Sequence, residues 1–453
     1  MSTNASSLTD FHRFETDKLE PFDMEDPPIY VCNTIRLNEG ISTKNYYCSL
    51  IHSILKILGY YVASSLQTLI LLDPDYYNAD PNSIGEITAG VLVLQLILNM
   101  VVNVAYGHLC DKLGRKTMIY YGAVNYLISC IVITTQRSIF PGFIIGKLML
   151  TNAEAALDSV PLTADYIHNE SKGKAVGMSG FLFSASSLVA NLYLKSLFYE
   201  DLSLGKIYMI TGGFIFIALI INSFGLKGGQ YHLFNERKNS NIYVDLPFWQ
   251  RVKEALQSFR SNGWLIIALI LQVLGSSDFY IFFTFLLLFV KSMMPPDVPE
   301  MTFNILINNL QTLVILPGIV TNFLYGYFLD KKNKPLETAI FALAGGAAAS
   351  LLTCFVTNPY DWKIFASALL LGLTIPGLFV ISMYLTIKHI PSDKRGLMIG
   401  FKSMVGDIAY FVIASGGGLL YDYWRKDGPF IICTIMLTIA LISTLIVHKK
   451  MLT

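Results

Sequence analysis

The sequence Tyr106-Gly107-His108-Leu109-Cys110-Asp111-Lys112-Leu113-Gly114-Arg115-Lys116 forms a short basic segment between two long apolar runs. A second segment, Tyr325-Gly326-Tyr327-Phe328-Leu329-Asp330-Lys331-Lys332-Asn333-Lys334, repeats it in the second half of the chain. With Asn103 and Asn322 included, both copies read Asn-x-x-Tyr-Gly-x-x-x-Asp-Lys-x-x-(Arg/Lys). The copies are 219 residues apart (326 − 107 = 219), almost half of the 453-residue chain. This spacing predicts two copies of one structural unit, with a binding site where the two halves meet.

The composition is typical of a membrane protein. Hydrophobic residues make up 53% of the chain and charged residues only 14%. A soluble protein of this length needs more charge to cover its surface, so several membrane spans are expected. The net charge of +1 gives no reason to expect nucleic acid as a partner. The six cysteines stand singly, without the paired spacing of a metal site, so neither a metal nor another cofactor is expected.

Stretches of about twenty apolar residues can cross the hydrocarbon layer of a membrane as helices. Twelve such stretches are expected, near residues 51–72, 87–110, 117–136, 140–163, 174–199, 206–226, 264–290, 303–329, 337–356, 362–387, 397–421 and 429–447. The predicted fold class is therefore an all-α membrane protein with two six-helix bundles, at residues 47–226 and 263–450. Lysine and arginine concentrate in the loops at 112–116, 172–174, 331–334 and 394–395, which predicts that these loops and both termini are cytosolic.

Two polar segments lie outside the predicted spans. Residues 1–46 hold four Lys or Arg against eight Asp or Glu. An acidic segment without an apolar core is unlike a presequence or a cleavable signal, so we expect a cytosolic tail that is disordered or docks on a protein partner. Residues 227–262 form a linker with an amphipathic stretch, which predicts a helix on the cytosolic membrane surface that tethers the halves. Its apolar face comprises Phe248, Val252, Ala255, Leu256 and Phe259.

The repeated loops and a second repeated pair resemble the major facilitator superfamily of transporters. Gly107-x-x-x-Asp111-x-x-Gly114-Arg115-Lys116 is similar to the superfamily's signature between spans 2 and 3, with a weaker copy from Gly326 to Lys334. Lys172-Gly173-x-x-x-Gly177 and Arg395-Gly396-x-x-x-Gly400 open spans 5 and 11, 223 residues apart (395 − 172 = 223). The resemblance covers about residues 47–450. It implies that a small solute binds at mid-depth between two bundles, which then rock about it.

The repeated loops are expected to close the cytosolic side of such a protein. Gly107 and Gly326 allow close contact between helices. Asp111 can accept hydrogen bonds from the positive amino end of a neighbouring helix, which the resemblance identifies as span 11. Arg115 can then bridge nearby acidic groups. The alternative is that these charges only fix the topology. The residues expected to gate the protein are Gly107, Asp111, Arg115, Asp165, Gly326, Asp330, Lys334 and Arg395.

Asp278 is the sharpest candidate for a binding site within the membrane. It lies near the middle of span 7, and no Lys or Arg lies within two turns of it on that helix. A charge inside hydrocarbon is costly and needs a functional or structural reason. Because the resemblance places span 7 on the cavity wall, Asp278 is a candidate for binding a proton, a cation or a basic group of the substrate. The alternative is a carboxylate paired structurally with another helix.

Span 4 carries a second set of charges, at Lys147, Glu154 and Asp158. Separations of seven and four residues place all three on one helical face. The two carboxylates can share the coupling role and suit cationic or neutral solutes, whereas Lys147 can bind an anion. The alternative is an internal Lys–Glu network that holds span 4 in the bundle. Further candidates that can hydrogen-bond a substrate, or simply join helices, are Tyr60, Gln67, Gln272 and Tyr280.

These features predict a secondary transporter, a symporter or antiporter, rather than an enzyme. Its expected partners are membrane lipid, a small solute and protons, with proton coupling through Asp278. The sequence contains no nucleophile–base arrangement and no phosphate-binding glycine loop attached to a soluble domain. The alternative is a non-transporting scaffold or sensor subunit of a larger membrane assembly, with the acidic tail as its docking arm. A lysine at 147, where the superfamily often has arginine, motivates that alternative.

Overall fold

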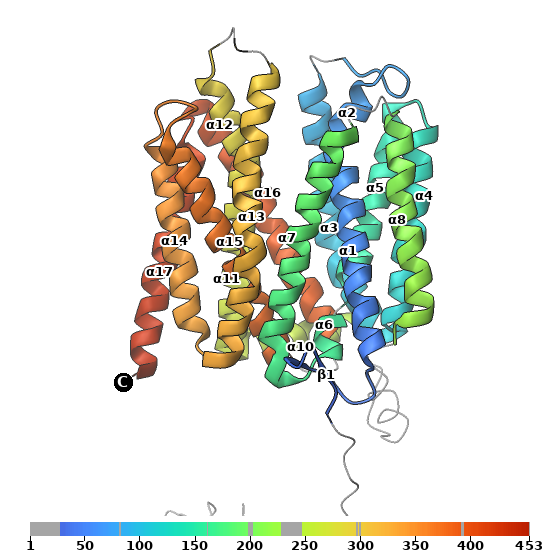
Figure 1. The fold of residues 1–453 in the computed structure, drawn as a ribbon, viewed down its shortest axis with the longest axis vertical. Coiled ribbons are helices and arrows are strands. Elements are labelled where there is room, and N and C mark those ends of the chain that lie inside the picture. Colours follow the sequence, from blue (N-terminus) through green and yellow to red (C-terminus); the bar gives the residue numbers. More distant parts are fainter. Residues whose placement is uncertain are drawn as a thin grey trace, which may run out of the picture.

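The chain folds into two helical halves that lie side by side, the first half in blue to green and the second in yellow to red (Figure 1). The computed structural model describes residues 28–80, 83–160, 162–197, 203–227, 247–295, 298, 300–390 and 394–452. Within these ranges, eleven helices are long and apolar enough to cross a membrane. The fold is therefore mostly helical, as the apolar runs predict.

The first half begins with α1, whose amino end lies on the same side of the molecule as the repeated loop. Its helical elements are α1 (Thr43–Ser65), α2 (Gln67–Leu72), α3 (Ile84–Leu113), α4 (Arg115–Thr135), η1 (Ile139–Phe143), α5 (Ile144–Asp158), α6 (Leu162–Tyr166), η2 (Asn169–Ser171), α7 (Lys172–Leu197) and α8 (Leu204–Gly225).

The second half follows the linker and has the same sequence of long helices joined by short turns. The linker contains α10 (Phe248–Ser261), and the second half comprises α11 (Gly263–Tyr280), η3 (Ile281–Phe285), α12 (Leu286–Met293), α13 (Glu300–Lys332), α14 (Pro335–Cys354), α15 (Trp362–His389), α16 (Arg395–Tyr423) and α17 (Gly428–Leu452). The π-helical turn η3 joins α11 and α12 into one continuous span over Gly263–Met293.

The segment predicted to span the membrane at 140–163 does not form one long apolar helix. Its central helix α5 has 15 residues and carries Lys147, Glu154 and Asp158, so it is not among the eleven apolar helices. It nevertheless packs against α3 and α4 within the first half. The predicted count of twelve spans therefore remains a prediction, as does the cytosolic location of both termini.

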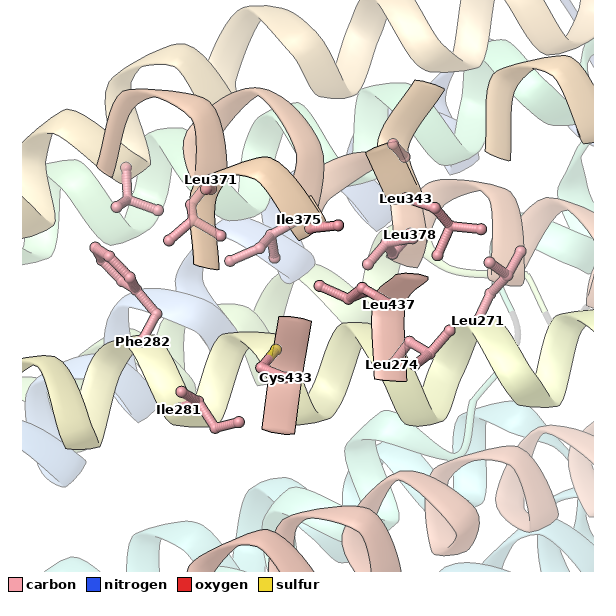
Figure 2. Packing of buried hydrophobic residues seen from close by; sticks show 14 of the residues in the cluster. Leu271, Leu274, Ile281, Phe282, Leu343, Leu371, Ile375, Leu378, Cys433 and Leu437 are labelled. Carbon is pink, nitrogen blue, oxygen red and sulfur yellow. The ribbon is translucent and has the colours of Figure 1, made fainter. Parts of the chain in front are cut away.

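Each half packs around its own apolar core. In the second half, Leu271 of α11 lies near Leu378 of α15, and α17 contributes Leu437 to the same cluster (Figure 2). A separate buried cluster in the first half includes Val62 of α1 and Tyr126 of α4. Helices in a membrane associate through close van der Waals packing. Each half therefore has a core of its own, and Ala164 and Val176 of the first half also join the second-half cluster.

Residues 28–42 fold against the first half instead of extending away from it. The strands β1 (Tyr30–Val31) and β2 (Ile35–Arg36) form an antiparallel hairpin. Three residues join the strands, and the first two, Cys32 and Asn33, have positive φ, as the central residues of a type I′ turn do. Residues 28–46 of the predicted acidic tail are therefore folded, and residues 1–27 lie outside the described part of the chain.

The amphipathic stretch of the linker is helix α10. Ala255 and Phe259 are buried in a cluster with residues of α11 and α16, which agrees with the predicted apolar face. Leu256, expected on the same face, is 48% exposed. Residues 228–246 of the linker lie outside the described part of the chain.

Candidate functional site

The first repeated loop brings α3 of the first half against the start of α16 in the second half. The Asp111 carboxylate accepts hydrogen bonds from the backbone N–H groups of Gly396 and Leu397, each at 2.9 Å. These N–H groups have no partner within their own helix, and the helix dipole favours a negative charge at this end. A Cβ atom on Gly107 would collide with the carbonyl oxygen of Gly396. Glycine at both positions therefore permits this contact.

A buried cluster of charges joins the same two halves. Arg115 donates to Asp111 at 2.8 Å and to Asp165 at 2.7 Å. Arg395, at the start of α16, donates to the other oxygen of Asp165 at 3.0 Å. Each carboxylate thus contacts groups from both halves. Such pairs contribute little net stability when complete, but removal of one partner leaves a buried charge and is costly.

The second repeated loop forms the equivalent contact between α13 and the start of α7, which lie beside each other in the centre of Figure 1. The two oxygens of Asp330 accept hydrogen bonds from the N–H groups of Gly173 and Lys174, each at 2.7 Å. Gly326 lies against the backbone of Gly173. Lys334, expected among the gating residues, instead pairs with Glu337 on the exposed start of α14 at 2.7 Å. Its ammonium group thus differs from the guanidinium of Arg115, which binds the aspartate of its own loop.

A cavity of ≈ 190 Å³ lies between the two halves, next to the first contact. Its walls come from α3 and α5 of the first half and from α11 and α16 of the second. The lining includes three carboxylates and three amides, from Glu154, Asp158, Asp407, Asn99, Asn103 and Gln272. A larger cavity of ≈ 390 Å³ is bounded by α11, α16 and α17, lined almost wholly by apolar side chains, and belongs to the second half alone.

The cavity between the halves is acidic. Asp158 accepts a hydrogen bond from Lys56 of α1 at 2.5 Å. Asp407 accepts one from the side-chain amide of Asn103 at 2.6 Å. Glu154 lines the same cavity and interacts electrostatically with Lys147 and Lys56. Within the described residues, Lys56 is the cation that pairs directly with one of the three carboxylates. A confined negative potential of this kind attracts protons and cationic groups.

The remaining predicted binding residues divide into two groups. Gln272 lines the cavity, and the ring of Tyr280 lies 5.5 Å from the ring of Tyr410, which also lines it. Tyr60 instead stacks on Tyr126 inside the first half, with ring centroids 5.5 Å apart. Gln67 and Lys147 are buried in the first half and do not contribute to the cavity lining.

Asp278 lies inside the second half, away from the cavity between the halves. Its Oδ1 atom lies 3.4 Å from Cys433 Sγ of α17 and 3.5 Å from Ser350 Oγ of α14. Its Oδ2 atom has no hydrogen-bond partner among the described residues. Ser276 of the same helix lines the cavity. Because residues two apart point to nearly opposite sides of a helix, Asp278 does not lie on the cavity wall, where the sequence analysis expected it.

Asp407, Asn99 and Lys56 belong to the site, although the sequence patterns did not indicate them. A signal for the first two exists in the repeat. Gly107 faces Gly396, and one turn away from the loop Asn103 faces Gly400. Further from the loop, Asn99 lies one turn beyond Asn103 on α3 and Asp407 lies two turns beyond Gly400 on α16, and both line the cavity. No comparable signal points to Lys56, because its pairing depends on how α1 packs near α5.

Comparisons with known proteins agree with this architecture. An uncharacterized transporter of Buchnera aphidicola subsp. Schizaphis graminum is 26% identical over 144 residues, which are 32% of this chain and only 36% of that relative. The proton:xylose symporter XylE has a TM-score of 0.66 at 13% identity, over 88% of this chain and 94% of that chain.

A bacterial homologue of the iron transporter ferroportin, solved in an outward-facing state with soaked iron, has a TM-score of 0.65 at 14% identity. The match covers 89% of this chain and 99% of that one. At these identities the two solved structures show a common fold. The family model described as Major Facilitator Superfamily matches residues 53–294 and 280–450, which include both repeated loops and both walls of the cavity. With two helical halves joined through paired glycine contacts, the chain therefore belongs to the Major Facilitator Superfamily.

Proposed function

We propose that this protein is a secondary active transporter that carries a small solute by alternating access, coupled to protons. The acidic cavity supports the proposal most directly, because both halves contribute carboxylates to it. A solute bound there contacts both halves at once. Movement of one half relative to the other would then change its access from one side of the membrane to the other.

The two loop contacts would close one side of the cavity. In each, an aspartate on one half accepts hydrogen bonds from the first backbone N–H groups of a helix on the other half. These bonds cross between the halves, whereas the first core lies within its half and the second takes in only Ala164 and Val176 of the first half. The halves can therefore separate at the loops with most of each core retained. This is the kind of two-state element that alternating access requires.

Asp407 would link protonation to this movement. Its hydrogen bond from Asn103 crosses between α16 and α3. Separation of the halves breaks this bond and leaves the carboxylate free to bind a proton or a cationic group. By linkage, a proton or cation that binds Asp407 in the separated state favours that state. Glu154 and Asp158 supply further negative charge in the same cavity, which suits a cationic or neutral solute.

Asp278 is a second candidate for the coupling carboxylate. It is buried, and its Oδ2 atom has no partner among the described residues. A buried carboxylate without a cation is a plausible proton carrier, although it lies within one half. The two candidates therefore predict different phenotypes, since a proton on Asp278 does not alter a bond between the halves.

The proposal is tested with purified protein in two steps. First, a thermal-shift screen of metabolite classes identifies a solute that raises the melting temperature. Second, proteoliposomes are assayed for uptake of that solute driven by a pH gradient and for counterflow without a gradient. We expect both activities, with saturation by the solute. No stabilising solute in any class, together with no flux, would contradict transport. Loss of a co-purifying protein on deletion of residues 1–27, again without flux, would favour the scaffold alternative.

A further inference from the structure

The N-terminal hairpin (residues 28–41) is bonded to the short segment that carries Asp165. The Asn38 side-chain amide donates to the carbonyl oxygen of Asp165 at 2.8 Å. The Asn38 backbone N–H donates to the carbonyl oxygen of Tyr166 at 2.9 Å, and the His168 N–H donates to the carbonyl oxygen of Arg36 at 3.0 Å. Residues 36–38 of the hairpin thus run beside residues 165–168 and exchange backbone hydrogen bonds with them, as two neighbouring strands do.

Apolar side chains fix the hairpin in this position. Four of them, Val31, Ile35, Leu37 and Ile41, are between 2% and 4% exposed. They share a buried cluster with Tyr166 and Ile167 of the Asp165 segment and with Leu226 at the end of α8. Burial of apolar side chains is the dominant favourable contribution to folding. The hairpin is therefore an integral part of the first half.

The other side of the same segment contacts the second half. Asp165 accepts from Arg395 of α16 at 3.0 Å, and the neighbouring Ala164 carbonyl accepts from the same guanidinium at 3.2 Å. Among its described residues, the segment between α5 and α7 has two short elements, the five-residue helix α6 and the three-residue helix η2. Such short elements have few hydrogen bonds of their own, so their position depends on what packs around them.

The hairpin also reaches the second loop contact. Lys174 Nζ donates to the carbonyl oxygen of Thr34 at 3.1 Å, while the backbone N–H of the same lysine donates to Asp330 at 2.7 Å. Arg36 N–H donates to Ser171 Oγ, just before α7 begins. The hairpin therefore touches the first-half side of both contacts that join the halves on the loop side.

We propose that the N-terminal hairpin positions Asp165 for Arg395, so that it sets the balance between the closed and open states of the loop side, with Asn38 as the positioning residue. The inference rests on the proposed gating function of the loop contacts. All its bonds named above are to the first half, so the hairpin stays in place when the halves separate. Because the hairpin holds the Asp165 segment in place beforehand, closure of the loop side does not carry the entropy cost of ordering that segment, which favours the closed state.

The test measures the conformational balance directly. Spin labels are placed at Leu113 and Lys332, two exposed positions at the loop ends of α3 and α13, in a cysteine-free background. Their distance distribution reports whether the halves are together or apart on this side. Asn38→Asp replaces the amide donor by an acceptor of the same shape. We expect the population with the longer distance to rise by about fivefold or more, as for loss of one hydrogen bond.

Controls separate this effect from a general loss of stability. Asn125→Ala removes an amide that donates to the Tyr121 carbonyl within α4 at 2.9 Å, far from the hairpin in sequence, and should leave the distances unchanged. Arg395→Gln removes the second-half partner of Asp165 and should raise the population with the longer distance. Asn38→Gln retains an amide donor and should restore part of the closed population. The melting temperature is measured for every variant.

The outcomes distinguish this inference from the proposed function. If Arg395→Gln shifts the distances but Asn38→Asp does not, the hairpin has no positioning role, and the gate itself stands. If neither variant shifts them, the gating function of the loop contacts is wrong, and this inference falls with it. A shift in Asn38→Asp that matches Asn125→Ala would show a nonspecific effect and would also overturn the proposal. Because distances are read without substrate, failure to find a transported solute does not affect the result.

Discussion

Asn103 of α3 donates a hydrogen bond from its side-chain amide to Asp407 of α16 at 2.6 Å, between the two halves of the protein. The repeat has an equivalent pair, because Asn322 follows Asn103 by 219 residues (322 − 103 = 219) and Asp407 follows Ser184 by 223 (407 − 184 = 223). In that pair, Asn322 donates to Ser184 Oγ at 3.0 Å. The two contacts therefore share their geometry but differ in charge. A carboxylate in one and a hydroxyl in the other is the asymmetry expected where one site binds a proton or a cation.

Substitution of Asp407 by serine makes the two contacts alike. Because the hydroxyl keeps an acceptor for Asn103 but cannot hold a negative charge, we expect pH-gradient-driven uptake to fall by about 5- to 150-fold, the usual range of a coupling free energy. Counterflow, which needs no net proton movement, should be partly retained. Both are measured in proteoliposomes. The matched variant Ser184→Ala should largely keep gradient-driven uptake, because Asn322 retains the carbonyl oxygens of Gly180 and Gly318 as acceptors. Equal losses in both variants would show that the charge is unimportant.

Gly107→Ala should weaken closure on the loop side. The added methyl group would collide with the backbone of Gly396, so the helices must move apart, at a typical cost of about 1–3 kcal/mol. Cys110, fully buried beside this contact, is the reporter when the other five cysteines are replaced. We expect faster modification of Cys110 by a thiol reagent.

Gly90→Ala is the control, because a methyl group at this position of the same helix meets no atom within 4 Å. Its rate of Cys110 modification should equal that of the parent. An unchanged rate in Gly107→Ala would mean that the glycine contact does not govern access to Cys110.

Asp111→Asn should destabilise the protein more than Asp330→Asn. Asp111 is buried with Arg115, whose guanidinium would lose one of its two carboxylates, and such losses cost about 3 kcal/mol or more. Asp330 accepts mainly backbone hydrogen bonds, so its replacement should cost about 1–2 kcal/mol. The melting temperatures of the two variants in one detergent provide the comparison. The reverse order would show that the Arg115 cluster contributes nothing specific to the first contact.

Asp278→Asn distinguishes the two coupling candidates. If Asp278 carries the proton, this variant should abolish pH-gradient-driven uptake and leave counterflow partly intact. The amide fits the same volume between Cys433 and Ser350, so the fold should be retained and the melting temperature should change little. Unchanged gradient-driven uptake would remove Asp278 from the mechanism and leave the cavity carboxylates, with Asp407 first among them.

Much of the architecture could be predicted because it depends on local sequence. Long apolar runs must be helical in a membrane, since lipid offers no hydrogen-bond partners to the backbone. The repeated Gly and Asp positions predict close helix contacts and capped helix ends, and Gly107 and Asp111 form both at α16. Glu154 and Asp158 share a helical face by their spacing alone, and both line the cavity. Their proximity to Asp407, in contrast, depends on how α5 packs near α16, which the sequence of neither helix indicates.

The helices, the duplication and the glycine contacts follow from hydrophobicity, periodicity and residue size, so the residues alone predict them. The rotation of each helix about its axis, in contrast, becomes visible only once the helices are packed together. Rotation of α11 turns Ser276 toward the cavity and Asp278 toward α14 and α17. The contact between Asn38 and the carbonyl oxygen of Asp165 likewise appears only in the folded chain. The physical reason is that rotation and long-range pairing are set by the summed packing of many neighbours, and no short stretch of residues encodes that sum.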